Sequence, residues 1–98
     1  MTINTEKSGA ALTLRLSGRL DTTSAPELEK AIAAMPGDVQ ELTLDMAEVT
    51  YISSAGLRVL LGAQKKMNRI GSMTLTSVCE AVLDVLEITG FADILTIR

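Results

Sequence analysis

Two adjacent serines stand where the sequence pattern changes from strand to helix. The extended segment 50–52 precedes Ser53 and Ser54, and apolar residues then recur at the spacing of one helix face. A serine at a helix start often only accepts a hydrogen bond from a free N–H group of the first turn. The same N–H groups and the positive end of the helix dipole also favour a phosphate. The local pattern therefore leaves two interpretations open, helix capping and phosphorylation.

The residue types needed for catalysis are largely missing from this chain. It contains no histidine, so a serine nucleophile would lack its commonest general base. Asp21, Asp45 and Glu48 are isolated acids without the spacing of an acid/base pair or a metal site. Gly56 and Gly62 lack the surrounding pattern of a phosphate-binding loop. We therefore predict a binding module that is not an enzyme, with no catalytic residue, metal or cofactor.

Three segments resemble anti-sigma-factor antagonists (anti-anti-sigma factors), which are small bacterial regulators built from a single STAS domain. The segment Tyr51–Arg58 is similar to the serine-containing signature of that family. Ser17–Thr22 resembles the family's other marked loop, and Leu86–Leu95 resembles its characteristic tail. The three segments follow one another in the family's order. The resemblance thus implies one STAS domain over residues 1–98.

The resemblance also implies a function for the serine pair. When unphosphorylated, such proteins bind an anti-sigma factor that is also their serine kinase, of the GHKL type, and so free the sigma factor. Phosphorylation of one serine ends the binding, and a serine phosphatase is a further expected partner. The family's phosphoacceptor stands two residues before a Gly-Leu pair, which here gives Ser54, with Ser53 as the alternative. The chain departs from the family in having Ser53 where Asp is frequent and Ala55 where Ser or Thr is frequent.

By the same resemblance, the partner-binding surface combines the serine junction with the earlier loop. We expect it to comprise Asp21, Thr22, Ser53, Ser54, Gly56 and Arg58. Asp21 matches the family's loop acid, although an Asp in a turn can also simply bond its own backbone. A second class of function stays open, in which the domain is a scaffold subunit of a larger complex, such as a transporter-associated assembly, and is never phosphorylated. A scaffold would accept any small capping residue at the serine.

The hydrophobic pattern predicts an α/β fold with the order β-β-α-β-α-β-α-β. We expect strands over residues 2–7, 12–17, 42–46, 73–76 and 94–97, and helices over 24–34, from the serines to about 68, and over about 78–88. Strands that alternate with helices favour a parallel sheet, here preceded by an antiparallel hairpin. Because the strands alternate apolar and polar residues, the helices should pack mainly on one face of this STAS-like mixed sheet.

Composition limits the partners and the compartment. A chain of 98 residues supports a single core, and with only two aromatic residues that core must be aliphatic. The net charge of −3 and the scarcity of aromatics argue against nucleic-acid binding. One cysteine cannot form an internal disulfide, and neither a signal peptide nor a membrane-spanning run is recognisable. We therefore expect a cytoplasmic protein that is a monomer when free and does not bind membranes directly.

Overall fold

The computed structural model describes residues 1–98 and contains one mixed sheet of four strands. The strands are β1 (Thr2–Ser8), β2 (Ala11–Leu20), β3 (Glu41–Ile52) and β4 (Ser72–Thr76), and they lie side by side in that order. β1 pairs with β2 as an antiparallel hairpin, whose turn uses Gly9 at a φ of +59°. β2, β3 and β4 are parallel to one another. The predicted sheet type is thus confirmed.

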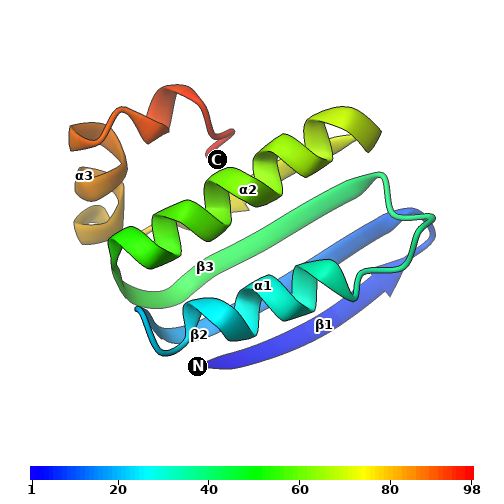
Figure 1. Ribbon diagram of the computed structural model, residues 1–98, viewed down its shortest axis with the longest axis horizontal. Helices are drawn as coiled ribbons and strands as arrows, with labels where there is room; N and C mark the ends of the chain where they lie inside the picture. The colour runs from blue at the N-terminus through cyan, green and yellow to red at the C-terminus, as the bar shows by residue number, and fades with distance from the viewer.

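The helices cover one face of this sheet, as predicted. They are α1 (Ala25–Ala33), α2 (Ser54–Ile70) and α3 (Glu80–Ile88), and a short 3-10 helix η1 (Phe91–Asp93) follows. Figure 1 shows α1 and α2 lying next to each other in front of the sheet, both beginning at the end where α3 is found. Since each connects parallel strands, both run back against the strand direction and start at the strands' carboxyl ends.

Strand alternation explains which face the helices cover. Leu12, Leu14 and Leu16 of β2 are buried on the helix side, while Arg15 between them is exposed. β3 repeats the alternation with the buried residues Leu42, Leu44 and Met46, and Val49 and Ile52 are also buried further along the strand. Leu28 of α1 and Leu60 and Met67 of α2 cover them. None of the core residues that are fully buried is aromatic, so the core is aliphatic.

The main departure from the predicted elements is at the carboxyl end. The predicted strand over 94–97 is reduced to an isolated parallel bridge between Leu75 of β4 and Ile97. Residues 91–93 form η1 instead of leading directly into a strand, and beside β4 the Leu75 N–H donates to the Thr96 carbonyl at 2.8 Å. β2 also continues past Gly18, where the pattern predicted its end, to Leu20. This extension carries the strand to the functional site.

Candidate functional site

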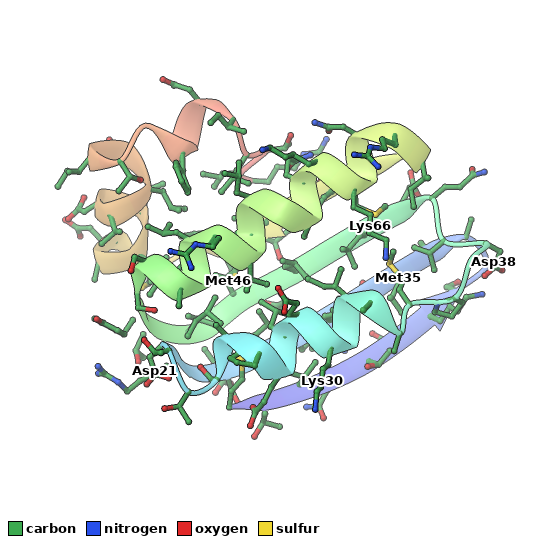
Figure 2. All side chains as sticks on the ribbon, in the orientation of Figure 1. Asp21, Lys30, Met35, Asp38, Met46 and Lys66 are labelled. Atoms are coloured by element: carbon green, nitrogen blue, oxygen red, sulfur yellow. The ribbon has the colours of Figure 1, made fainter.

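The two predicted functional loops meet because β2 and β3 end side by side. Leu20 and Ile52 are register partners at the ends of these parallel strands. Asp21 follows the first and Ser53 follows the second, so the two loops leave the sheet together. The Ser53 N–H donates to the Leu20 carbonyl at 2.9 Å and joins them directly. Figure 2 shows Asp21 at this end of the molecule, where β2 passes into α1.

Gly56 allows the first turn of α2 to pack against the end of β2. It is buried, and a Cβ atom built on it would lie 2.8 Å from Leu20 Cγ and 2.9 Å from the Leu20 carbonyl oxygen. The same atom would lie 3.0 Å from Ile52 Cγ1. These distances are below normal van der Waals contact, and two of the three atoms belong to side chains already packed in the core. The absence of a side chain at Gly56 therefore allows the first turn of α2 to pack closely against the ends of both strands.

The two serines have different environments. Ser53 is the N-cap of α2, is half-buried, and its Oγ accepts a hydrogen bond from the Gly56 N–H at 3.3 Å. Ser54 is the first residue of the helix, is exposed, and its hydroxyl makes no hydrogen bond within the protein. The capping interpretation thus applies to Ser53. The hydroxyl that is free to react is that of Ser54.

Asp21 closes its own loop through hydrogen bonds. Its Oδ1 accepts from the N–H groups of Thr23 and Ser24 at 3.0 and 3.1 Å, and from Ser24 Oγ at 3.2 Å. The backbone hydrogen bond from Ser24 is the main cause that holds the pKa of Asp21 below its usual value, and the guanidinium of Arg19 adds a smaller effect in the same direction. The turn interpretation of Asp21 is therefore observed, and its second oxygen, which accepts none of these hydrogen bonds, lies beside Arg19.

Ser24 is a structural residue that the sequence pattern did not single out. Its side chain is buried, donates to the Arg19 carbonyl at 2.5 Å and accepts from the Asp21 N–H at 2.9 Å. The spacing Asp-x-x-Ser before a helix, similar to that of a capping box, is a signal that could have indicated this pair.

Arg19 and Tyr51 form a second feature that was missed. They are register partners on β2 and β3, and the Arg19 guanidinium carbon lies 4.1 Å from the centre of the Tyr51 ring. This is the geometry of a cation–π contact. Tyr51 is nonetheless 41% exposed, and Arg19 Nε lies 3.8 Å from Asp21 Oδ2. An exposed aromatic ring, a cation and an acid therefore stand together beside the serine junction. Arg19 and Tyr51 come together only through the register between β2 and β3, which could not be predicted from the sequence pattern.

Thr22 and Arg58 lie on the other side of the junction, between the starts of α1 and α2. Both are exposed, and both line a hollow of about 160 Å³ that also includes Ala55. Arg58 follows Ser54 by four residues, so the two side chains lie on the same face of α2. Arg58 makes no ion pair within the protein. The structure thus brings all six predicted surface residues to one end of the molecule, with Gly56 alone among them buried.

The start of α2 also differs electrostatically from the other helix starts. The first turns of α1 and α3 carry Glu27 and Glu80, whereas the first turn of α2 carries no acid. The positive end of the α2 dipole is therefore not compensated by a side chain.

Sequence comparison assigns this arrangement to a known family. Residues 2–98 match the model of the STAS domain. The chain belongs to the STAS domain family. The STAS domain described here is 33% identical over 96 residues to BtrV of Bordetella bronchiseptica, a proposed anti-sigma factor antagonist, covering 96% of this chain and 83% of BtrV. It is 32% identical over 87 residues to the anti-sigma-B factor antagonist of Listeria monocytogenes, covering 85% of this chain and 75% of that protein. The predicted membership of the anti-sigma factor antagonist family is confirmed.

Solved structures show the same fold. An anti-sigma factor antagonist from Mycobacterium paratuberculosis superposes with a TM-score of 0.88 at 24% identity, covering 99% of this STAS domain and 84% of that chain. SpoIIAA superposes in its unphosphorylated form with a TM-score of 0.77, and SpoIIAA of Bacillus in its phosphorylated form with 0.76. Both SpoIIAA structures are 17% identical, and they cover 99% of this chain and 88% and 91% of theirs. No helix of this STAS domain has the length and apolar character needed to cross a membrane.

Proposed function

We propose that this STAS domain is an anti-sigma factor antagonist controlled by phosphorylation of Ser54. In its unphosphorylated form it binds an anti-sigma factor that is also a serine kinase of the GHKL type, and the sigma factor is released. Phosphorylation of Ser54 by that kinase ends the binding, and a serine phosphatase restores it. The domain itself catalyses no reaction in this scheme.

The proposal rests on the different roles of the two serines in the fold. Ser53 supplies the cap that α2 needs, which leaves the exposed Ser54 hydroxyl without a structural task. A kinase can reach an exposed hydroxyl without breaking a hydrogen bond of the fold. Ser53 is the weaker candidate because its modification would cost the cap.

The surroundings of Ser54 suit a phosphate within the molecule. A phosphate adds about −1.5 to −2 charges at neutral pH. Here it would meet the uncompensated positive end of α2, and Arg58 lies one turn further on the same face. We therefore expect phosphorylation to change the free energy of unfolding by no more than about 1 kcal/mol.

The same phosphate should act strongly across an interface. A partner that fits the neutral serine would have to desolvate the new charge, and without a cation facing it this costs several kcal/mol in order of magnitude. Fold stability and partner binding should thus respond separately. The names of the relatives support an anti-sigma factor as the partner, and the phosphorylated SpoIIAA structure shows that a protein of this fold accepts such a modification.

The decisive experiment tests the acceptor and the function together. The chain is incubated with ATP and each purified GHKL-type anti-sigma factor of its source genome, and phosphorylated peptides are mapped by mass spectrometry. We expect phosphate on Ser54 in the wild type and in Ser53→Ala, and none in Ser54→Ala. Phosphate on Ser53 alone would overturn the assignment. No phosphate, with a known antagonist modified in parallel, would favour the scaffold role.

Binding to the same kinase provides the second test. Ser54→Ala should bind as tightly as the unphosphorylated wild type in the presence of ATP, whereas Ser54→Asp should bind at least about a hundredfold more weakly. Both variants should melt within a few degrees of the wild type. Equal binding of Ser54→Asp and wild type would contradict a switch at this residue.

A further inference from the structure

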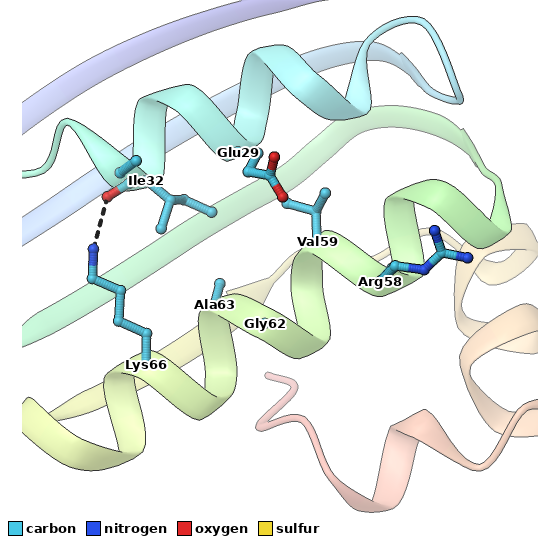
Figure 3. A pocket seen from close by; sticks show the side chains of 8 residues that line it. Glu29, Ile32, Arg58, Val59, Gly62, Ala63 and Lys66 are labelled. Atoms are coloured by element: carbon cyan, nitrogen blue, oxygen red, sulfur yellow. Dashed lines mark hydrogen bonds between the residues drawn. The ribbon is translucent and has the colours of Figure 1, made fainter.

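A groove between α1 and α2 extends from the serine junction along the surface. It has a volume of about 260 Å³, and Ile32, Val59 and Ala63 contribute apolar lining. Figure 3 shows Glu29 on α1 pointing toward Val59 on α2, while Arg58 extends toward the start of α2. At the far end, Lys66 Nζ donates to the Ile32 carbonyl at 3.3 Å and bridges the two helices. The groove thus has an apolar floor, charged rims and a closed end.

Gly62 keeps the middle of this groove open. It lies in the interior of α2, is exposed, and a Cβ atom built on it would meet nothing within 4 Å. A glycine at such a position destabilises a helix relative to alanine, which is a cost to the fold. Packing within the molecule gives no reason for this cost, in contrast to Gly56 on the same helix. The missing side chain leaves space in the groove.

The rims of the groove carry two opposite charges that are unused within the protein. Neither Glu29 nor Arg58 takes part in an ion pair or a side-chain hydrogen bond, although both line the groove. Charged groups arranged in this way favour a ligand that carries a cation on one side and an acid on the other. An amphipathic helix can present both beside an apolar residue.

The groove is also continuous with the hollow between the starts of α1 and α2, beside Ser54. Glu29, Arg58 and Val59 line both this groove and the smaller hollow that contains Thr22 and Ala55, the residue after Ser54. The volume of the groove is below the roughly 300 Å³ at which pockets for small molecules begin. Its size therefore suits one or two protruding side chains rather than an enclosed small ligand.

We infer that this groove is the second half of the anti-sigma factor's binding surface and seats one amphipathic helix of that partner. The inference rests on the proposed function. An apolar side chain of the helix lies over Gly62 and Ala63, a carboxylate of the helix pairs with Arg58, and a cation pairs with Glu29. The junction at Ser54 controls whether the partner binds, and the groove supplies much of the affinity.

The first test fills the groove. The affinity of the purified kinase-type anti-sigma factor that binds the wild-type chain is measured by calorimetry for Gly62→Leu and Gly62→Ala. Gly62→Leu should weaken binding at least about tenfold, and Gly62→Ala should weaken it less than about threefold. Gly37→Leu is the matched control, since Gly37 is also exposed with open space around its Cβ, but lies outside the groove. It should bind as the wild type does, and all three variants should stay folded by circular dichroism.

The second test reverses a rim charge. Glu29→Lys should weaken binding about tenfold, and the loss should shrink at high salt. Glu87→Lys makes the same change on the exposed surface of α3, away from the groove, and should have little effect. Equal losses in the two variants would show a general charge effect and overturn the assigned rim contact.

The outcomes separate this inference from the proposed function. If Ser54→Asp abolishes binding while Gly62→Leu and Glu29→Lys bind as the wild type does, the groove is not part of the interface and the inference is wrong. If no kinase-type anti-sigma factor of the source genome binds the wild-type chain, the proposed function is wrong. The inference that such a factor occupies the groove is then wrong as well.

Discussion

The two loops that form the site are built in opposite ways. In the β2–α1 loop, Asp21 and Ser24 bond each other and the backbone around them, and Ser24 is buried. The β3–α2 junction has one side-chain hydrogen bond, from the Gly56 N–H to Ser53, and leaves Ser54 exposed. One loop is fixed by polar contacts. The other is fixed by close packing at Gly56 and keeps its reactive group free.

This difference indicates how a surface can change without a change of fold. A modification of Asp21 or Ser24 would break hydrogen bonds that shape the β2–α1 loop, whereas a modification of Ser54 breaks none. The rigid loop can therefore serve as a fixed part of the binding surface, and the junction as the part whose charge varies. The predictions below test each half of this comparison, beginning with the largest expected effect.

Gly56→Val should lower the stability of the domain more than the other substitutions discussed below. The added Cβ would lie 2.8 and 2.9 Å from atoms of Leu20, one of them a backbone oxygen that cannot move freely. Overpacking of this kind costs about 3 kcal/mol, which for a domain of this size lowers Tm by more than about 10 °C. Thermal unfolding followed by circular dichroism measures the effect.

Gly62→Val is the matched control for that substitution. It places the same side chain on the same helix in open space, and valine is no worse than glycine in a helix interior. Its Tm should equal or exceed that of the wild type. A similar loss in both variants would mean that helix propensity, and not the contact with Leu20, explains the effect at Gly56.

Ser24→Ala should destabilise the polar loop. The substitution removes the hydroxyl that donates to the Arg19 carbonyl and accepts from the Asp21 N–H in a buried environment. We expect a loss of about 2 kcal/mol in urea unfolding. Thr22→Ala removes an exposed hydroxyl that makes no hydrogen bond in the same loop, and should change stability by less than about 0.5 kcal/mol. Equal effects would contradict the assigned role of Ser24.

The sequence predicted the position of the site better than the roles of its individual residues. Apolar alternation indicated the strands β2 and β3, and the helix between them indicated that they are parallel. Because they end side by side, Asp21 and Ser53 come together. In the polar run 21–24, only the Asp-x-x-Ser spacing distinguishes Ser24 from the two threonines, and that spacing does not show which of the three hydroxyls is buried. Helix starts are uncertain by one or two residues from sequence, and such a shift exchanges the roles of Ser53 and Ser54.

The carboxyl end shows a second limit of the sequence pattern. Leu95, Thr96 and Ile97 alternate as a strand would, and Leu95 is buried as that pattern indicates. Whether they join the sheet depends on how the chain approaches β4 after η1, and only Ile97 forms a bridge to β4. Register and length of this kind arise from tertiary contacts, which local periodicity does not contain.

Ser53→Ala compared with Ser54→Ala tests the division between the serines. Loss of the N-cap in Ser53→Ala should cost about 1 kcal/mol, whereas Ser54→Ala should lie within about 0.5 kcal/mol of the wild type. Ser53→Asp keeps an acceptor at the cap and should recover most of the loss. If Ser54→Ala were the more destabilised variant in urea unfolding, Ser54 would be the cap and the free hydroxyl would belong to Ser53.

The smallest effect concerns the charge of Asp21 and appears only in acid. Hydrogen bonds, first of all from the Ser24 N–H, hold the pKa of Asp21 in the folded state below its usual 3.8. The folded state thus favours the carboxylate, so its contribution to stability is complete above about pH 4 and is lost as pH falls through the lowered pKa. Asp21→Asn does not titrate. The difference in unfolding free energy between wild type and Asp21→Asn should therefore be constant from about pH 7 to pH 5 and shrink below the usual pKa.

Asp38 makes this test specific, because its pKa is also lowered but for another reason. The main cause that lowers the pKa of Asp38 is the side-chain hydrogen bond from Lys7, which is a surface ion pair at 3.0 Å. Asp38→Asn should therefore show the same direction of change in acid. Salt separates the two. About 1 M NaCl screens an exposed ion pair, whereas hydrogen bonds from the backbone to Asp21 depend less on ionic strength. The acid-dependent difference should consequently survive high salt for Asp21→Asn and fade for Asp38→Asn. If both fade together, the charge of Arg19 and not the closed loop holds Asp21 ionised, and the β2–α1 loop is less rigid than its hydrogen bonds indicate.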